Sequence, residues 1–469
     1  MSGQRKGWCP GALKPMRTGD GLLVRVRLTA GVLEPETAKA LARAARDFGN
    51  GLLDLTARAN LQMRGVSDKA LEPLLDRLAE LGVLDESEAA EQVRNVLASP
   101  LAGIDPTELI DAGPLVQALE RRLTAEAAFQ ALPSKFGFLI DGGGALPLDD
   151  VEADIGLRAV DAEVFRLTAG DVELGVIGRE DAVEAALEVA ATFLRLRRPD
   201  ERRMRDVVGR LQDETREIPS HEAEEGSQTK SGREGCGPLA IFGQDLVGSL
   251  IAENDGSGLH PSRPGFAAQP SPASWGGAVI SRLAGHRAFS PTSGFVAAAA
   301  PFGRLDADQL EGLGVIASNH NLALRLSLWR ALLLAPIEQG LASLIATKVA
   351  ALGLVIDPDD PRLAIAACPG SPSCLSGEAP AQIDAARLAP VLASFVRQGA
   401  SVHVSGCAKG CARRAPASLV LVGQNGRYGL AFHADSHASS ETPPMDVDEI
   451  AAFLKRPSAQ EGFKRNNHV

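Results

Sequence analysis

Hydrophobic and polar positions in the N-terminal part of the chain follow two different periods. Residues 22–28, LLVRVRL, alternate apolar and basic side chains, which is typical of a strand with one buried face. Pro35–Phe48 has apolar residues at helical spacing behind an N-terminal proline and ends before glycine. A second alternating segment, residues 53–65, precedes a helix at about Ser67–Leu81, with Ser67 as the N-cap. The pattern predicts a strand–helix–strand–helix unit.

The same order of patterns returns in the second half of the chain. Residues 293–300, SGFVAAAA, predict a strand, and Asp306 opens a helix. Residues 322–334 alternate like a strand, and a further helix begins at about Glu338. Matching positions are separated by nearly the same number of residues in both copies. We therefore predict an internal duplication, whose period is far longer than the roughly 20–50 residues of solenoid repeats.

Two segments between the copies lack any such periodicity. Residues 197–235 are dense in charged side chains, and residues 255–278 are rich in proline, serine and glycine. These compositions predict linkers or surface loops.

Composition limits the class of protein. The chain has 469 residues, a hydrophobic fraction of 45% and a formal net charge of −11. Its length predicts more than one domain, and its acidity argues against nucleic acid as the main partner. No apolar run reaches the roughly 20 residues that cross a bilayer, and the N-terminus has no apolar signal core. We expect a cytoplasmic protein without a membrane partner.

Four of the six cysteines form two short clusters. Cys368 and Cys374 are separated by prolines and a glycine, which predicts a loop, whereas Cys407 and Cys411 are four residues apart. On a helical turn the second pair would have Cβ atoms about 5–6 Å apart, too far for a disulfide. A [4Fe–4S] cluster, a single zinc ion or four separate thiols would fit, and the spacing favours the cluster. The other two cysteines, at positions 9 and 236, are predicted to be unpaired thiols.

The alternating segment 53–65 carries an unusual polar face. If it is one strand, five polar side chains without an acid point to the same side: Thr56, Arg58, Asn60, Gln62 and Arg64. Arg25 and Arg27 share a face of the preceding strand. Such a face is either solvated or presents donors to carboxylates or another anion. Arg94 is a further candidate for the same anion site. So is Lys135, which precedes a predicted short strand and the glycines 142–144, whose backbone N–H groups suit contacts with an anion.

These motifs together resemble those of the sirohaem nitrite and sulfite reductase superfamily. The cysteine spacing, the duplicated unit and the segment LTARANLQ match its cluster motif and its Thr-x-Arg-x-Asn-x-Gln strand, and the resemblance extends over most of residues 10–455. It implies an α+β, pseudo-twofold fold in which two ferredoxin-like half-units form one domain and two α/β lobes surround a tetrapyrrole cleft. The implied boundaries are residues 10–82 and 291–355 for the half-units, 83–215 and 356–456 for the lobes, and 216–290 for a linker.

The resemblance also implies roles for individual residues. Cys368, Cys374, Cys407 and Cys411 would hold the cluster. Arg58, Arg94 and Lys135 match three of the four cations that bind the inorganic anion, and Gly137 stands where the superfamily has a second lysine. We predict these three as catalytic residues, and Arg25, Asn60, Gln62 and Arg64 as substrate-binding residues. Losing one cation should weaken the binding of nitrite or sulfite.

Other departures point to a particular branch of the superfamily. Trp329, Arg330 and Lys409 replace residues typical of the reductases, and the N-terminal segment and residues 405–416 resemble a branch in which the tetrapyrrole is the substrate. That branch hydroxylates precorrin-3A at C20 with O2 in aerobic cobalamin biosynthesis, closing a γ-lactone from the ring A acetate to give precorrin-3B. The alternatives are a sirohaem-dependent nitrite or sulfite reductase and a non-catalytic electron carrier.

The branch implies two cofactors and an electron source. The cofactors are a [4Fe–4S] cluster and a mononuclear non-haem iron. His433, Asp435 and His437 are the residue types of an iron-binding triad, but a solvated loop is the better prediction for them, and we assign no ligands. Because no dinucleotide-binding glycine motif follows a strand, NADH would act through a partner reductase.

Overall fold

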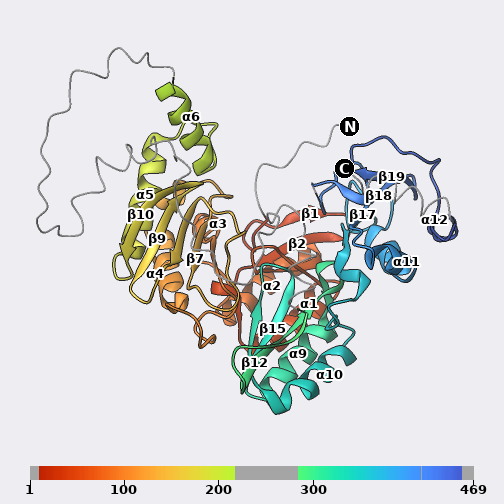
Figure 1. The fold of residues 1–469 in the computed structure, drawn as a ribbon, viewed down its shortest axis with the longest axis horizontal. Coiled ribbons are helices and arrows are strands. Elements are labelled where there is room, and N and C mark those ends of the chain that lie inside the picture. Colours follow the sequence, from red (N-terminus) through yellow and green to blue (C-terminus); the bar gives the residue numbers. More distant parts are fainter. Residues whose placement is uncertain (1–9, 217–283, 414, 457–469) are drawn as a thin grey trace, which may run out of the picture. The chain divides into compact units, whose positions relative to one another are not determined.

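The computed structural model describes residues 10–216, 284–413 and 415–456 (Figure 1). Two compact units divide the chain: a large unit, formed by Met1–Glu86 and Pro270–Val469, and a small unit, Ser87–Gln269. The predictions for the cysteines at 9 and 236 and for residues 255–278 lie outside the described residues. No helix among the described residues is long and apolar enough to cross a membrane.

The first half-unit has the predicted helices. Pro35 is at the first position of α1, and the Ser67 hydroxyl accepts a hydrogen bond from Ala70 N (3.2 Å) at the start of α2, so both predicted helix starts are confirmed. The elements are β1 (Met16–Thr18), β2 (Gly21–Val26), η1 (Thr29–Gly31), β3 (Val32–Leu33), α1 (Pro35–Phe48), β4 (Leu52–Leu55), β5 (Leu61–Val66) and α2 (Asp68–Glu80).

The second half-unit repeats this order, which confirms the predicted duplication. Its elements are β11 (Gly285–Ala288), β12 (Ser293–Ala299), η3 (Pro301–Gly303), β13 (Arg304–Asp306), α9 (Ala307–Asn319), β14 (Ala323–Leu326), β15 (Ala331–Glu338), η4 (Gln339–Leu341) and α10 (Ala342–Ala351). Asp306 caps α9 with a capping box, as its position predicted. Strand β11 corrects the end of the linker predicted for 216–290, because it pairs with β12 along the edge of a sheet. Residues 217–283 of that range lie outside the described residues.

The two long alternating segments are hairpins and not single strands, which corrects the prediction. The Thr56 hydroxyl accepts hydrogen bonds from the backbone N–H groups of Arg58 and Asn60, and this turns the chain between β4 and β5. Ser327 does the same between β14 and β15, with Trp329 and Ala331 as donors. Side-chain oxygens of Ser and Thr can close such turns without a glycine. The alternation of apolar and polar residues therefore continues through both turns, and the sequence shows no break between the strands.

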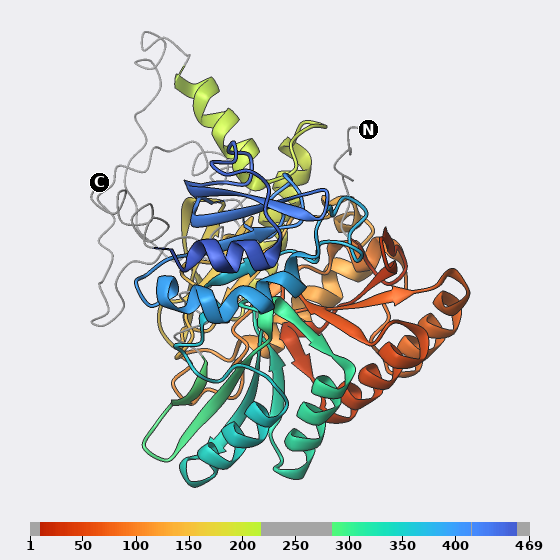
Figure 2. The same ribbon diagram turned by 90° about the vertical axis from the view of Figure 1, so that its right-hand side faces the viewer.

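The two half-units exchange their edge strands. One sheet has the order β1-β2-β5-β4-β13 and the other β11-β12-β15-β14-β3, so each takes its last strand from the other half. Leu33 and Leu305, on the exchanged strands, are buried, and α1 packs against α9. Figure 2 shows both half-units, red and green to cyan, as sheets with helices along them. Folding of either half-unit therefore depends on the other.

The small unit is an α/β lobe. Strands β6, β7 and β8 are parallel neighbours, and β9 and β10 follow antiparallel. Its elements are α3 (Glu88–Val93), β6 (Val96–Ala98), α4 (Ala112–Ala125), η2 (Phe129–Ala131), β7 (Phe138–Asp141), β8 (Ile155–Ala159), β9 (Val164–Ala169), β10 (Val172–Gly178), α5 (Ala182–Leu196) and α6 (Met204–Arg216). Helix α6 corrects the first part of the loop prediction for 197–235: Met204, Val207 and Val208 are buried, and charged side chains lie on its other side. Residues 217–235 lie outside the described residues.

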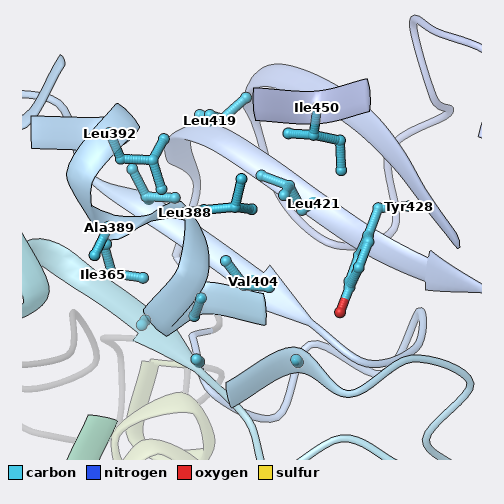
Figure 3. Packing of buried hydrophobic residues seen from close by; sticks show 14 of the residues in the cluster. Ile365, Leu388, Ala389, Leu392, Val404, Leu419, Leu421, Tyr428 and Ile450 are labelled. Atoms are coloured by element: carbon cyan, nitrogen blue, oxygen red, sulfur yellow. The ribbon is translucent and has the colours of Figure 1, made fainter. Parts of the chain in front are cut away.

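The C-terminal lobe, residues 356–456 of the large unit, repeats the strand order of the small unit. Strands β16, β17 and β18 are parallel neighbours, and β19 follows antiparallel. The elements are η5 (Pro361–Ala364), β16 (Ile365–Ala367), α11 (Ala381–Val396), β17 (Val402–Ser405), β18 (Ala417–Gln424), β19 (Arg427–Ala434) and α12 (Val447–Leu454). Side chains of α11 and α12, among them Leu388 and Ile450, pack on Val404 and Leu421 of the sheet (Figure 3).

Candidate functional site

The two cysteine clusters begin at the same edge of the C-terminal sheet. Cys368 directly follows β16, and Cys407 lies two residues after the end of β17. These strands are parallel neighbours with Ala367 opposite Val404, so their carboxyl ends lie side by side. In open α/β sheets this edge is the usual place for a bound group. The fold therefore brings the two cysteine loops together, although more than thirty residues separate them in sequence.

Backbone contacts hold the two loops against each other. The Gly406 N–H donates to the Cys368 sulfur at 3.1 Å. A Cβ at Gly406 would lie 2.8 Å from the Cα of Gly370, so only glycine fits this approach. Burial raises the pKa of the Cys368 thiol, and the N–H groups of Gly406 and Gly370 oppose that rise because they stabilise a thiolate. A negative charge on Cys374 or Cys411 would raise this pKa further.

The other cysteines are fixed by turns. The Cys374 N–H donates to the carbonyl of Gly370 (2.7 Å), which confirms the tight loop predicted for the first pair. The Ser405 hydroxyl donates to the carbonyl of Cys407 (2.6 Å). Cys407 and Cys411 lie on consecutive turns and not on the helical turn considered from their spacing, because Gly410 adopts a φ of 58°. Cys411 is exposed.

The donor set fits an iron–sulfur cluster better than a single ion. Within the described ranges, no three His, Cys, Asp or Glu side chains are grouped closely enough to hold one metal ion, and no disulfide joins the four cysteines. A [4Fe–4S] cluster binds each cysteine to a different iron and so needs a wider spacing of sulfurs than zinc does. An N–H donor to a ligand sulfur, as from Gly406, is the kind of contact that tunes such clusters.

The small unit has a different structure at the equivalent edge. Ser99 follows β6 where Cys368 follows β16, and glycines 142–144 follow β7 where Gly406 and Cys407 follow β17. We predicted these glycines to offer N–H groups to an anion. Instead, the Gly143 N–H donates to Asp141 (3.0 Å), and the Ala145 N–H donates to Asp105. The acidic side chains of the lobe itself bind this loop.

Glu108, which packs against the same glycine loop, should make stability depend on pH. Burial raises its pKa from 4.5 to about 7, although the N–H groups of Gly103 and Ala112 oppose the rise. The folded state then keeps a proton that the unfolded state loses, so stability falls as the pH rises from about 4.5 to 7. Between pH 5 and pH 8, the free energy of unfolding of wild type should fall by about 1 kcal/mol more than that of Glu108→Gln. This figure is reduced for solvent screening of the carboxylate. Urea unfolding at both pH values measures this, and equal losses would contradict it.

Part of the predicted polar face exists on the first sheet. Arg25 of β2 lies opposite Gln62 of β5, and Gln62 lies opposite Asp54 of β4, so these three share a face. At the matching positions of the second sheet are Ala297 and Leu333, which are apolar and buried, and Arg325 of β14, which lies opposite Leu333. On this face the second half-unit therefore has apolar side chains in place of Arg25 and Gln62, and a side chain of opposite charge in place of Asp54.

Two residues of that set have other environments than predicted. Asn60 is buried, and its side-chain oxygen accepts a hydrogen bond from Leu28 N (3.1 Å), which ties the hairpin to the end of β2. The Arg64 side chain is 4% exposed and forms ion pairs with Asp20 (3.0 Å) and Asp54 (2.8 Å). Both side chains hold parts of the fold together instead of presenting an open donor face.

Of the three predicted catalytic residues, Arg58 belongs to the large unit, and Arg94 and Lys135 belong to the small unit. Arg58 lies half-buried in the turn between β4 and β5. In the small unit, Arg94 is the C-cap of α3, and its guanidinium is 3.5 Å from the Glu120 carboxylate. Lys135 is exposed in the turn before β7, as its position predicted. Gly137, which stands where the superfamily has a second lysine, donates its backbone N–H to the Asp154 carboxylate (2.8 Å). This hydrogen bond fixes the backbone at that position.

Sequence reasoning missed one buried histidine beside the cysteine loops. His403 of β17 is fully buried, and neither of its ring nitrogens has a hydrogen-bond partner. Burial, together with the charge of Arg413, lowers its pKa to about 4, so the ring is neutral. The equivalent residue of β7 is Leu139, and a single histidine in an otherwise apolar strand was the available signal. His433, Asp435 and His437 belong to no metal-binding group in the part of the chain that the structure describes.

Comparisons with known proteins agree with this architecture. Residues 14–81 match the model of the nitrite/sulfite reductase ferredoxin-like half domain, and residues 89–217 match that of the nitrite and sulphite reductase 4Fe-4S domain. The second range contains no cysteine, and the four clustered cysteines lie in the C-terminal lobe, whose sheet has the same strand order. The NirA protein of Mycobacterium tuberculosis has a similar fold, with a TM-score of 0.64 and 19% identity over 96% of this chain and 82% of that chain.

Two relatives distinguish the branches of this fold. A ferredoxin–nitrite reductase of Synechococcus elongatus is 36% identical, but over only 26% of this chain and 25% of its own length. A precorrin-3B synthase of Sinorhizobium is 32% identical over 454 residues, 96% of this chain and 87% of that protein. The fold and the cysteine site define an oxidoreductase of the nitrite and sulfite reductase type. Within that class, the chain belongs to the precorrin-3B synthase family of cobalamin biosynthesis.

Proposed function

We propose that the protein converts precorrin-3A to precorrin-3B with molecular oxygen, hydroxylating C20 and closing a γ-lactone from the ring A acetate. The observation that carries this proposal is the similarity to a precorrin-3B synthase along almost the whole chain, in contrast to the partial matches with nitrite reductases. One oxygen atom of O2 enters the product and the other leaves as water, so the reaction also consumes two electrons and two protons from a reductant. We propose that NADH supplies them through a partner reductase.

The four cysteines at the edge of the C-terminal sheet would hold the [4Fe–4S] cluster. When bound, such a cluster supplies single electrons. Cys368 is buried and receives the Gly406 N–H, whereas Cys411 is exposed at the far end of its loop. The loops thus contribute one buried, hydrogen-bonded ligand and one ligand open to its surroundings.

Positive side chains would bind the acetate and propionate groups of the substrate. We propose Arg58, Arg94 and Lys135 for this role, with Arg25 and Gln62 as further donors on the polar face of the first sheet. A glycine at position 137 leaves one cation fewer for a small inorganic anion, whereas a polycarboxylate can bind at several separate points. This difference favours a precorrin over nitrite or sulfite as the substrate.

The family resemblance implies a mononuclear non-haem iron, but the described residues include no set of ligands that fits it. Within residues 10–216, 284–413 and 415–456, no three potential ligands are grouped for one ion. We therefore propose no ligands for it.

Removing a carboxylate-binding cation should weaken substrate binding. We expect Lys135→Ala and Arg58→Ala each to raise the apparent KM for precorrin-3A roughly tenfold or more, because hydrogen bonds to charged groups contribute about 1.5–3 kcal/mol. Steady-state kinetics under limiting substrate measures this. Lys348→Ala removes an exposed lysine of α10 and serves as the control, with unchanged KM. Unchanged KM in the first two variants would contradict their role.

The visible spectrum separates this function from that of a reductase. Protein purified without oxygen should contain iron and acid-labile sulfide in the amounts of one [4Fe–4S] cluster and should show no sirohaem absorption. Bound sirohaem together with nitrite or sulfite reduction would overturn the proposal in favour of the reductase.

A further inference from the structure

We propose that Arg64 and Asp20 hold the loop of Cys374 in place and set the reduction potential of the cluster. This inference rests on the proposed binding of a [4Fe–4S] cluster by the four cysteines. Arg64 was predicted to bind substrate, but its contacts point to the cysteine loop instead. In this role Arg64 is a positioning residue, since it touches the loop and not the substrate.

The contact is made at the residue before the cysteine. Arg64 Nη2 donates to the carbonyl oxygen of Ser373 at 2.6 Å, and Ser373 directly precedes Cys374. The Gly19 N–H donates to the same carbonyl at 3.3 Å. The first half-unit therefore contacts the cysteine loop of the C-terminal lobe through the backbone N–H of Gly19 and the side chain of Arg64.

The fit between the two segments is close. A Cβ on Gly19 would lie 1.9 Å from the carbonyl oxygen of Pro372, so the turn between β1 and β2 has no room for a side chain there. Within the large unit, this turn and strand β5 together fix the loop that bears Cys374. A shift of either would move the cysteine.

The charges beside this loop are buried. The side chains of Arg64, Asp20 and Asp54 are 4%, 11% and 14% exposed, and Arg64 pairs with both acids. Although burial raises the pKa of Asp20, the hydrogen bonds from Arg64 lower it below its usual value, so the carboxylate stays ionised. Asp54 is also bound by Arg304 at 2.6 Å. Fixed charges of both signs thus lie where water screens them poorly.

These charges should act on the cluster in opposite directions. Reduction adds an electron, so a nearby guanidinium stabilises the reduced form and a nearby carboxylate destabilises it. Neutralising Arg64 should lower the midpoint potential, and neutralising Asp20 should raise it. Loss of a purely structural contact would give no such opposite pair of shifts.

The test is a redox titration of the cluster, followed by electron paramagnetic resonance, in the full-length protein. We expect the midpoint potential of Arg64→Gln to shift to more negative values, that of Asp20→Asn to more positive values, and that of Arg64→Lys to stay closer to wild type than Arg64→Gln. Arg17→Gln is the control, because Arg17 lies on β1 and forms an exposed pair with Asp68. Its potential should equal that of wild type.

Each outcome has a defined meaning. Shifts of both neutralising variants in the same direction, or no shift in either, would overturn this inference while leaving the cluster assignment intact. Absence of iron and sulfide from the wild-type protein would instead overturn the proposed function. If Arg64→Gln does not fold, the sign of the Asp20→Asn shift decides, because a negative or absent shift contradicts the inference.

Discussion

Cys368→Ser is expected to abolish cluster binding and, with it, the formation of precorrin-3B. Cys368 is the buried member of the four cysteines, and its sulfur receives the Gly406 N–H at 3.1 Å. A serine hydroxyl is close to a thiol in size but is a poor ligand for iron–sulfur clusters, so the fold should survive. We expect loss of cluster absorption and of its iron and sulfide, and product formation below detection. Iron analysis and chromatography of the reaction mixture measure both.

The small unit offers a matched control for this substitution. Ser99 lies after β6 as Cys368 lies after β16, and its hydroxyl accepts a hydrogen bond from Leu101 N (3.3 Å). Ser99→Ala should keep a full complement of iron and sulfide. A Cys368→Ser variant that retains the cluster would show that the cysteine set is assigned wrongly.

Asp54→Ala should cause the largest loss of stability. Asp54 pairs with Arg64 (2.8 Å) and Arg304 (2.6 Å), and its charge also opposes the burial that lowers the pKa of Arg330 to about 10. Removing one partner from a buried charge network leaves the remaining charges uncompensated and typically costs about 3–5 kcal/mol. Because proteins are stable by only about 5–15 kcal/mol, urea unfolding should shift to much lower denaturant concentration.

An exposed ion pair of the same half-unit is the control. Glu80→Ala breaks the pair with Arg77, whose side chains are 65% and 41% exposed, and should change stability by less than about 1 kcal/mol. Equal effects of Asp54→Ala and Glu80→Ala would mean that the network around Asp54 contributes no more than a surface pair.

The sequence was most informative where local signals repeat. Pro35, Ser67 and Asp306 marked helix starts that the structure confirms, and the repeated spacing predicted the duplication. Capping and periodicity are local properties, so a single sequence displays them. The exchange of β3 and β13 is not local, because it depends on which strand edges meet after folding. No residue pattern of either half could indicate it.

The predicted site divides in the same way. Cysteine chemistry and spacing were sufficient to predict that residues 368 and 407 belong to one site. In the structure both follow neighbouring parallel strands. The polar face was predicted from alternation alone, which treated a hairpin as one strand. The structure instead uses Asn60 to join backbone segments and Arg64 to bind buried acids and the Ser373 carbonyl. Alternation gives the side of a strand but cannot show what faces it.

The most direct test of the proposed function is the fate of oxygen. The anaerobically purified protein, supplied with precorrin-3A, a reductant and isotopically labelled O2, should give a product that contains one labelled oxygen atom by mass spectrometry. A product without label, or no precorrin product together with consumption of nitrite, would contradict the assignment as an oxygen-dependent precorrin hydroxylase.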